Sequence, residues 1–238
     1  MKKLLFIVIA LVSVSVVSAQ EKKKNSGFMS RTGDHLILQI TSDHWMGAPD
    51  SIKNRMSGLA RGANVYVMLD QRFKGSPNWS VAFGLGVGTS NIYFKNTVVD
   101  SKSKTNTLPF RNVDSVDHFK KYKLTTAYLE IPVELRFTFD PENENKSIKA
   151  ALGVKVGTLL NVHTKGKTLQ DKNGTAINNY TAKETAKGFF NSTRLAATAR
   201  VGYGNFSLSG SYQINNILKD GVGADMKLFQ IGLTFSGL

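Results

Sequence analysis

The stretch WSVAFGLGVGTSN, residues 79–91, alternates between large apolar side chains and small ones. The large residues stand at the odd positions Trp79, Val81, Phe83, Leu85 and Val87. The small ones stand at the even positions Ser80, Ala82, Gly84, Gly86, Gly88 and Ser90. Successive side chains of a β-strand point to opposite faces, so this period of two predicts a strand with one apolar face and one nearly bare face.

The same period recurs along the chain. In residues 128–139 the apolar face carries Leu129, Ile131, Val133, Leu135, Phe137 and Phe139. The alternation is also present in residues 35–40, 63–70, 148–157, 194–203, 206–214 and 229–235. The pattern therefore predicts eight strands.

The composition of the less apolar face indicates which side of the strands is inside. A soluble barrel with an apolar interior would need a polar coat, but this face is largely Gly, Ala and Ser. We therefore expect apolar side chains to face lipid and small or charged ones to fill a narrow lumen. The charged residues assigned to the lumen are Glu130, Glu134, Arg136, Lys149, Lys155, Arg194 and Arg200. We expect them to form an ion-pair plug, because buried ions need partners.

The connections alternate between long and short. The longer ones are residues 42–57, 95–121, 161–192 and 215–226, and the shorter ones are 71–77, 140–147 and 204–205. This alternation is typical of outer-membrane barrels. We predict an all-β fold: an eight-stranded antiparallel up-and-down transmembrane β-barrel with short periplasmic turns and long extracellular loops. Eight strands leave room only for side chains inside, so a diffusion pore is not expected.

The N-terminus predicts export. Lys2 and Lys3 precede an apolar run, residues 4–17, which ends at Val17-Ser18-Ala19, a pattern typical of a signal peptide cleaved after Ala19. The run is shorter than the roughly 20 residues that a membrane-spanning helix needs. The expected organisation is a signal peptide at 1–19 and a single barrel domain at 20–238. The chain has no cysteine, so no disulfide framework is available.

The charge balance suggests an anionic partner. The net charge of +14 falls to about +12 once Lys2 and Lys3 leave with the signal. For an exported chain, anionic lipid is a better partner than nucleic acid, which we do not expect. The expected partner is outer-membrane lipid, including lipopolysaccharide. The candidate lipid-binding residues lie in the two long basic loops: Lys102, Lys104, Lys165, Lys167 and Lys172. A merely solvated loop fits the same pattern.

No motif predicts a catalytic, cofactor-binding or metal site. The four histidines are His35, His44, His118 and His163. None has a potential ligand partner at i+2 or i+4, as a zinc site built on one strand or helix would need. The glycines of residues 84–88 lack the G-x-G-x-x-G spacing of a nucleotide loop. For a lipid A-modifying barrel enzyme, the nearest candidate is His163 beside Thr164.

Three segments resemble a known family. Residues 128–133 (YLEIPV), 200–221 with Arg200-Val201-Gly202-Tyr203-Gly204, and 229–233 (FQIGL) are similar to small outer-membrane β-barrel proteins of Bacteroidota. This is the PorT-like, or outer membrane protein β-barrel domain, family. The resemblance implies the fold and the outer-membrane location. One member type is associated with type IX secretion machinery. The chain departs from many such barrels in ending with Ser236-Gly237-Leu238 after Phe235 rather than with an aromatic residue.

Three functional hypotheses follow. The leading one is a non-enzymatic barrel that presents basic extracellular loops in a structural or interaction role, with lipid headgroups or an unknown protein as partner. The alternatives are a component of a type IX-like secretion system and, with less support, a lipid A-modifying enzyme.

Overall fold

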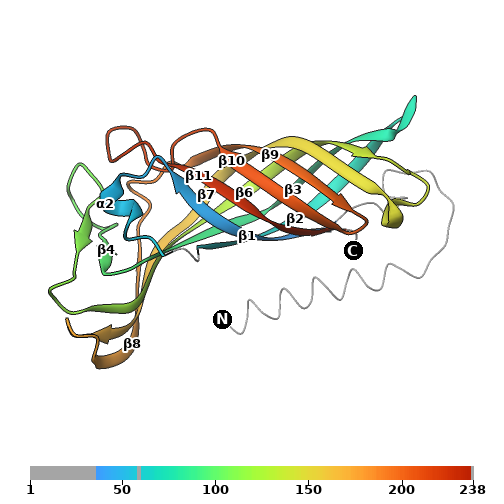
Figure 1. Ribbon diagram of the computed structural model, residues 1–238. Coiled ribbons are helices and arrows are strands. Elements are labelled where there is room, and N and C mark those ends of the chain that lie inside the picture. Colours follow the sequence, from blue (N-terminus) through green and yellow to red (C-terminus); the bar gives the residue numbers. More distant parts are fainter. Residues whose placement is uncertain (1–35, 58–59, 237–238) are drawn as a thin grey trace, which may run out of the picture. The chain divides into compact units, whose positions relative to one another are not determined.

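Eight antiparallel strands form a closed barrel in the computed structural model, which describes residues 36–57 and 60–236 (Figure 1). They are β1 (Leu36–Met46), β2 (Arg61–Phe73), β3 (Ser76–Phe94), β6 (His118–Thr138), β7 (Ile148–Gln170), β9 (Thr193–Tyr203), β10 (Phe206–Gln213) and β11 (Lys227–Ser236). Each pairs with the next in the chain, and β1 closes the ring against β11, from Ile37 opposite Ser236 to Met46 opposite Lys227. The predicted eight-stranded barrel is confirmed. The predicted signal peptide at 1–19 lies outside the described residues.

The two faces of the wall have the predicted polarity. Ile40, Leu152 and Leu233 point outward and are 68–72% exposed. Tyr66 and Glu130 point inward and are 4% and 0% exposed. A barrel can expose this apolar wall to lipid because closure leaves no strand edge unpaired in hydrocarbon. Among the described residues, no helix combines the length and apolar character needed to cross a membrane.

The small inward residues are a steric requirement of the narrow interior. A Cβ added at Gly88 would collide with the carboxylate of Glu130, and one at Gly86 would collide with the carbonyl oxygen of Val65. At Gly88 the lumen thus has room for either the carboxylate of Glu130 or a side chain at residue 88.

One end of the barrel has tight turns. Gly204 adopts a left-handed conformation (φ 57°) in the turn between β9 and β10. The turn between β6 and β7 contains the short 3₁₀ helix η2 (Glu144–Lys146). The other end carries α2 (Asp50–Lys53), the hairpin of β4 (Thr97–Val99) and β5 (Phe110–Asn112), and β8 (Ala176–Thr185). These are the periplasmic and extracellular ends, respectively, of an outer-membrane barrel.

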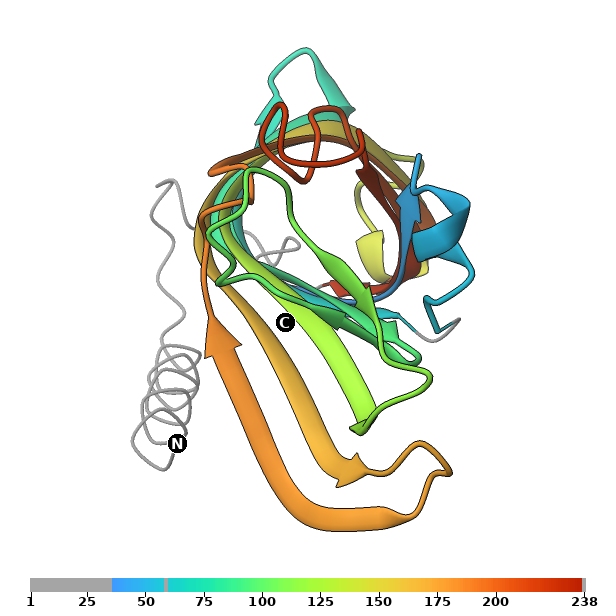
Figure 2. The same ribbon diagram turned by 90° about the vertical axis from the view of Figure 1, so that its left-hand side faces the viewer.

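The prediction that residues 161–192 form a loop is wrong for much of its length. β7 continues to Gln170, pairs with β6 throughout, and turns into β8, which pairs back onto β7 (Figure 2). Residues 118–121, also expected in a loop, belong to β6. The prediction failed because it relied on an apolar outward face. Beyond the membrane that face carries lysines, while the backbone pairing continues unchanged. We call this β6–β7–β8 sheet, residues 118–125, 163–170 and 176–185, the extension.

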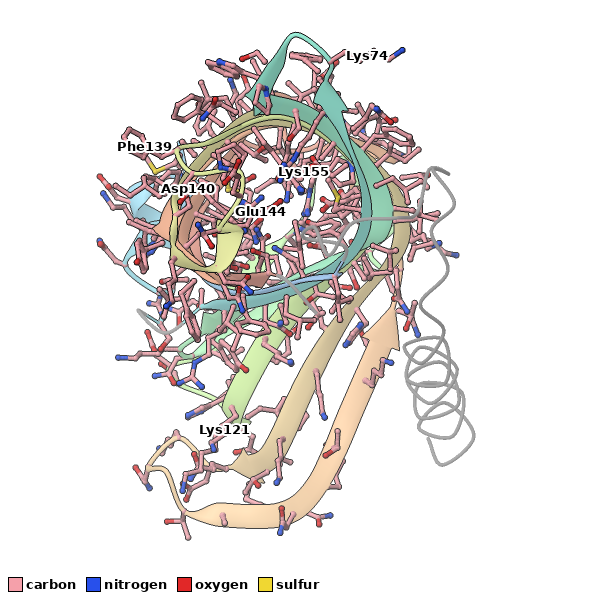
Figure 3. The ribbon with its side chains drawn as sticks, turned by 90° about the vertical axis from the view of Figure 1, so that its right-hand side faces the viewer. Lys74, Lys121, Phe139, Asp140, Glu144 and Lys155 are labelled. Atoms are coloured by element: carbon pink, nitrogen blue, oxygen red, sulfur yellow. The ribbon has the colours of Figure 1, made fainter. Side chains whose placement is uncertain are left out.

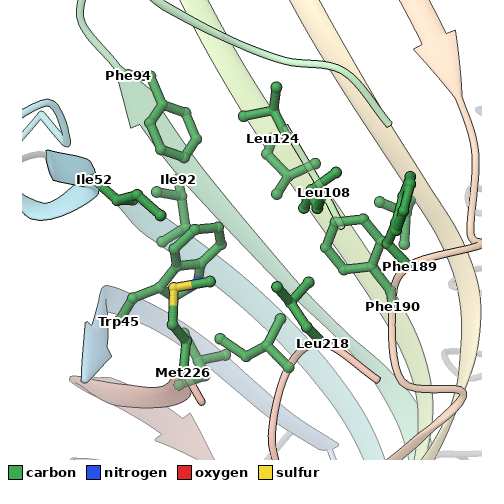
Figure 4. Close-up of a cluster of buried hydrophobic side chains, with 14 of the residues drawn as sticks. Trp45, Ile52, Ile92, Phe94, Leu108, Leu124, Phe189, Phe190, Leu218 and Met226 are labelled. Atoms are coloured by element: carbon green, nitrogen blue, oxygen red, sulfur yellow. The ribbon is translucent and has the colours of Figure 1, made fainter. Parts of the chain in front are cut away.

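An apolar cluster fills the extracellular half of the lumen (Figure 4). Inward residues of the wall, including Trp45, Ile92 and Leu124, pack against residues of the loops. The loop residues include Ile52, Leu108, Phe189, Phe190 and Leu218. We call this cluster the apolar cap. The alternating pattern did not predict this cap, because it placed small or charged residues throughout the interior.

Candidate functional site

Glu130 is the centre of one ionic cluster inside the barrel. Its Oε2 accepts a 2.6 Å hydrogen bond from Tyr66 Oη and lies 3.3 Å from Lys155 Nζ. Its Oε1 accepts a 3.1 Å hydrogen bond from Arg194, whose guanidinium also stacks 3.8 Å from the centre of the Tyr128 ring. A fully buried carboxylate is therefore compensated by two cations and a phenol, as burial of an ion requires.

Glu134 is the centre of a second cluster, closer to the periplasmic end. Its Oε2 accepts hydrogen bonds from Arg136 Nε at 2.9 Å and from Arg200 Nη2 at 3.0 Å. Arg136 Nη1 also lies 3.6 Å from Oδ1 of Asp70, which accepts a 2.8 Å hydrogen bond from Ser80. One carboxylate thus holds two arginines that come from strands on either side of β7.

The periplasmic turn completes the ionic interior. Glu144 of η2 forms a salt bridge with Arg72, and its Oε2 lies 3.9 Å from Lys149 Nζ. Figure 3 shows Glu144 and Asp140 at this mouth of the barrel and Lys155 within the ring of strands.

The structure places all seven residues assigned to the ion-pair plug inside the barrel, in these three clusters. Four partners were missing from the predicted set: Tyr66, Asp70, Arg72 and Glu144. Tyr66 and Asp70 lie on the inward face that the alternation assigned. Glu144 lies in a turn, where no periodicity shows which way a side chain points.

The lumen has little free space. Two cavities between the ionic clusters measure about 20 Å³ each, and one below the apolar cap measures about 10 Å³. A single water needs roughly 10–15 Å³. With the apolar cap above the ionic clusters, these side chains form a plug rather than a channel.

The five predicted lipid-binding lysines do not form one group. Lys102 and Lys104 lie between β4 and β5, Lys172 lies in the turn between β7 and β8, and Lys165 and Lys167 lie on β7. The register instead brings Lys165 between Lys123 of β6 and Lys183 of β8. We call these three the lysine row.

The outer face of the extension is strongly basic. Lys121 and Lys167 pair directly in the next row, and His163 lies two residues from Lys165 on the same face. The inner face is different, because Tyr122, Leu124 and Thr164 are buried. The five lysines of these two rows form no salt bridge with any residue that the structure describes. Lys123 Nζ instead donates a 2.6 Å hydrogen bond to Asn91 and lies 5.6 Å from the centre of the Tyr93 ring.

The described residues offer no obvious catalytic or metal chemistry. No three His, Cys, Asp or Glu side chains within them are grouped to hold a metal ion. His163 and Thr164 point to opposite faces of β7, since Thr164 is buried and His163 is half-buried on the outer face. They therefore do not form the pair that a lipid A-modifying site would need.

A closed eight-stranded barrel with an apolar outer wall and a filled ionic lumen defines the class of outer-membrane β-barrel proteins. Comparison with known families agrees with this geometry. The family described as "Outer membrane protein beta-barrel domain" matches residues 19–219, and the chain belongs to it.

Solved structures of similar proteins include Ail, the attachment invasion locus protein of Yersinia pestis. It has 14% identity and a TM-score of 0.36, and the match covers 84% of this chain and 95% of Ail. Ail in complex with the heparin analogue sucrose octasulfate gives 12% identity and a TM-score of 0.35, with coverage of 84% and 95%. Neisserial surface protein A gives 14% identity and a TM-score of 0.33, with coverage of 84% and 96%. No curated protein sequence matches the chain.

Proposed function

We propose that this protein is a non-enzymatic outer-membrane barrel whose outer surface binds phosphate groups of lipopolysaccharide. The observation that carries the proposal is the lysine row, in which Lys123, Lys165 and Lys183 lie side by side on three neighbouring strands. Residues directly opposite in antiparallel strands have Cβ atoms roughly 4.5–5.5 Å apart.

The lysine row is unfavourable without an anion. Like charges directly opposite on neighbouring strands destabilise a sheet. A phosphate group between two lysines would replace this repulsion with charge-assisted hydrogen bonds. The row is thus a surface that gains stability from a bound phosphate.

The position of the row suits the headgroup region of the outer leaflet. On β7 the outward residues run from Leu152, Val154 and Val156 to Leu160, all at least 44% exposed, and then to His163 and Lys165. The outward apolar residues of β7 therefore end at Leu160, shortly before Lys165 on the same strand. An anionic membrane surface attracts each nearby Lys or Arg by about 1 kcal/mol.

The test compares binding of the detergent-folded barrel to phosphorylated and dephosphorylated lipid A. We expect tighter binding of the phosphorylated form and a marked loss of affinity as salt rises, because the Debye length is only about 8 Å at physiological ionic strength. The double variant Lys165→Glu, Lys183→Glu should lose the preference for phosphate.

Lys74→Glu is a matched control, because Lys74 lies in the turn between β2 and β3 at the opposite end of the barrel (Figure 3). It changes the net charge but should keep the preference. Charge reversal at Lys102 and Lys104 tests the loop residues separately. If the affinity depends on neither the phosphate groups nor the salt concentration, the basic face is solvated surface that does not bind lipopolysaccharide, and the proposal is wrong.

A second hypothesis rests on the resemblance to PorT-like barrels of Bacteroidota. It assigns the chain to a type IX-like secretion system, with a protein partner in place of lipid. Co-purification from native membranes tests it: enrichment of secretion components with the barrel would support it, and their absence would leave the lipid-binding proposal.

A further inference from the structure

We propose that the outer face of the extension binds two phosphate groups of one lipid molecule, so that the barrel selects diphosphorylated lipid A over the monophosphorylated form. This inference rests on the proposed function, in which the lysine row binds the first phosphate. The second phosphate binds at the neighbouring row of Lys121, Lys167 and Thr181, which we call the distal row.

The distal row repeats the arrangement of the lysine row. Lys121 of β6 and Lys167 of β7 lie directly opposite each other, and both are exposed. Neither forms a salt bridge with any residue in the described part of the chain. Like charges in this position destabilise a sheet, so an anion between them relieves the repulsion. Thr181 of β8, opposite Lys167, adds a hydroxyl donor.

The outer face of the extension carries no carboxylate that could neutralise these lysines. Glu184 is the one carboxylate within residues 118–125, 163–170 and 176–185. It lies opposite Thr164, which is buried on the inner face, so Glu184 belongs to the row of that face. The positive charge of the outer face therefore has to be matched by a ligand or by solvent ions.

The orientation of the extension favours a lipid as that ligand. Figures 1 and 2 show β8 and the end of β7 projecting sideways beyond the ring of strands, and Figure 3 labels Lys121 on the projecting part of β6. The inner face is held toward the extracellular loops, because Tyr122 Oη donates a 3.0 Å hydrogen bond to the carbonyl oxygen of Val99 and accepts one of 3.1 Å from its N–H. The outer face of a sheet that leans away from the wall turns toward the surrounding membrane surface.

The amount and spacing of charge call for two phosphates. Four exposed lysines contribute to the two rows: Lys121, Lys165, Lys167 and Lys183. A phosphate monoester carries a charge of about −1.5 to −2 at pH 7, so two of them match four lysines and one matches only half. The backbones of the two rows are about 7 Å apart, at a rise of about 3.4 Å per residue. Lipid A carries its phosphates at the two ends of a disaccharide, so each row can hold one.

Binding of the detergent-folded wild-type barrel to three forms of lipid A tests the inference. We expect the affinity to fall roughly tenfold or more from the diphosphorylated to the monophosphorylated form, which loses the contribution of two lysines. The fully dephosphorylated form should bind more weakly still. Equal affinity for the first two forms, with weaker binding of the third, would overturn the distal row and leave the proposed function intact. Equal affinity for all three would refute both.

A pair of variants assigns the effect to the distal row. Lys121→Gln with Lys167→Gln should bind the diphosphorylated and monophosphorylated forms equally, and should still prefer both to the dephosphorylated form. Lys74→Gln with Lys146→Gln makes the same change of charge in two turns at the periplasmic end, and should keep the full preference. A distal-row variant that still separates the first two forms as the wild type does would contradict the inference.

Discussion

Arg194 of β9 donates a 3.1 Å hydrogen bond to Oε1 of Glu130 on β6, although β7 lies between these two strands in the barrel wall. The two side chains therefore meet inside the lumen over Gly157 of β7 and tie together strands that share no backbone hydrogen bond. With Lys155 on β7, the cluster connects three consecutive strands through one carboxylate. The ionic interior thus links strands beyond their nearest neighbours in the wall.

Removal of one ionic partner should destabilise the barrel strongly. Glu130→Gln keeps the shape of the side chain but leaves Lys155 and Arg194 without their counter-ion. Glu134→Ala and Arg136→Ala break the second cluster in the same way. Loss of one partner of a buried pair costs about 3–5 kcal/mol. Unfolding in detergent, followed by tryptophan fluorescence, should show this loss.

Lys172→Ala is the control for those variants. Lys172 is exposed in the turn between β7 and β8, and surface substitutions usually change stability by no more than about 0.5 kcal/mol. Equal and small effects of all four substitutions would show that the ionic clusters do not stabilise the fold.

Gly88 should be intolerant of even a methyl group. A Cβ at this position would displace the carboxylate of Glu130, which its hydrogen bonds hold in place. Gly88→Ala should therefore lower the unfolding temperature. Gly75→Ala, in the turn between β2 and β3, meets no atom within 4 Å and should be nearly neutral. A neutral Gly88→Ala would mean that Glu130 can move, and that its cluster is loosely held.

The barrel should not conduct ions steadily. The apolar cap blocks the extracellular half of the lumen, and the cavities among the ionic clusters have room for about one water each. Purified protein in a planar bilayer should give no large, stable single-channel steps. Such steps would require a wider or emptier lumen than these side chains leave.

The extracellular loops should loosen only at very low pH. Arg55, just after α2, donates a 2.7 Å hydrogen bond to Asp114 in the segment between β5 and β6, and this contact holds the pKa of the Asp114 carboxyl well below its usual range. A carboxyl with a lowered folded-state pKa stabilises the fold above its unfolded pKa of about 3.9. That stabilisation is lost as the pH falls through the lower folded value. The contact should therefore be at full strength from about pH 5 upward.

NMR titration of the Asp114 carboxyl measures this effect. Arg55→Gln should move the pKa of Asp114 up toward the ordinary value for aspartate. The titration of Asp140, whose low pKa comes from Asn143 and the turn backbone at the other end of the barrel, should not change. An Asp114 pKa that does not respond to Arg55→Gln would contradict the proposed cause.

Local periodicity was sufficient for the barrel itself. In residues 79–91 and 128–139 the side chains alternate so regularly that strand, lipid face and lumen face follow from the pleat alone. The short turn at Gly204 and Asn205 could be predicted for a similar reason, because its geometry depends on neighbouring residues. All these properties are decided within a dozen residues of chain.

The partners of the ionic residues and the lysine row depend on register instead. Lys123, Lys165 and Lys183 are far apart in the sequence, and only the pairing of β6 with β7 and of β7 with β8 sets them side by side. Arg194 meets Glu130 because the pairing of β6 and of β9 with β7 sets both residues opposite Gly157. A shift of two residues between strands would preserve every alternating face and yet change each of these contacts. The pattern of faces is therefore local, whereas the choice of partner is made by the register between strands and by the space left inside the barrel.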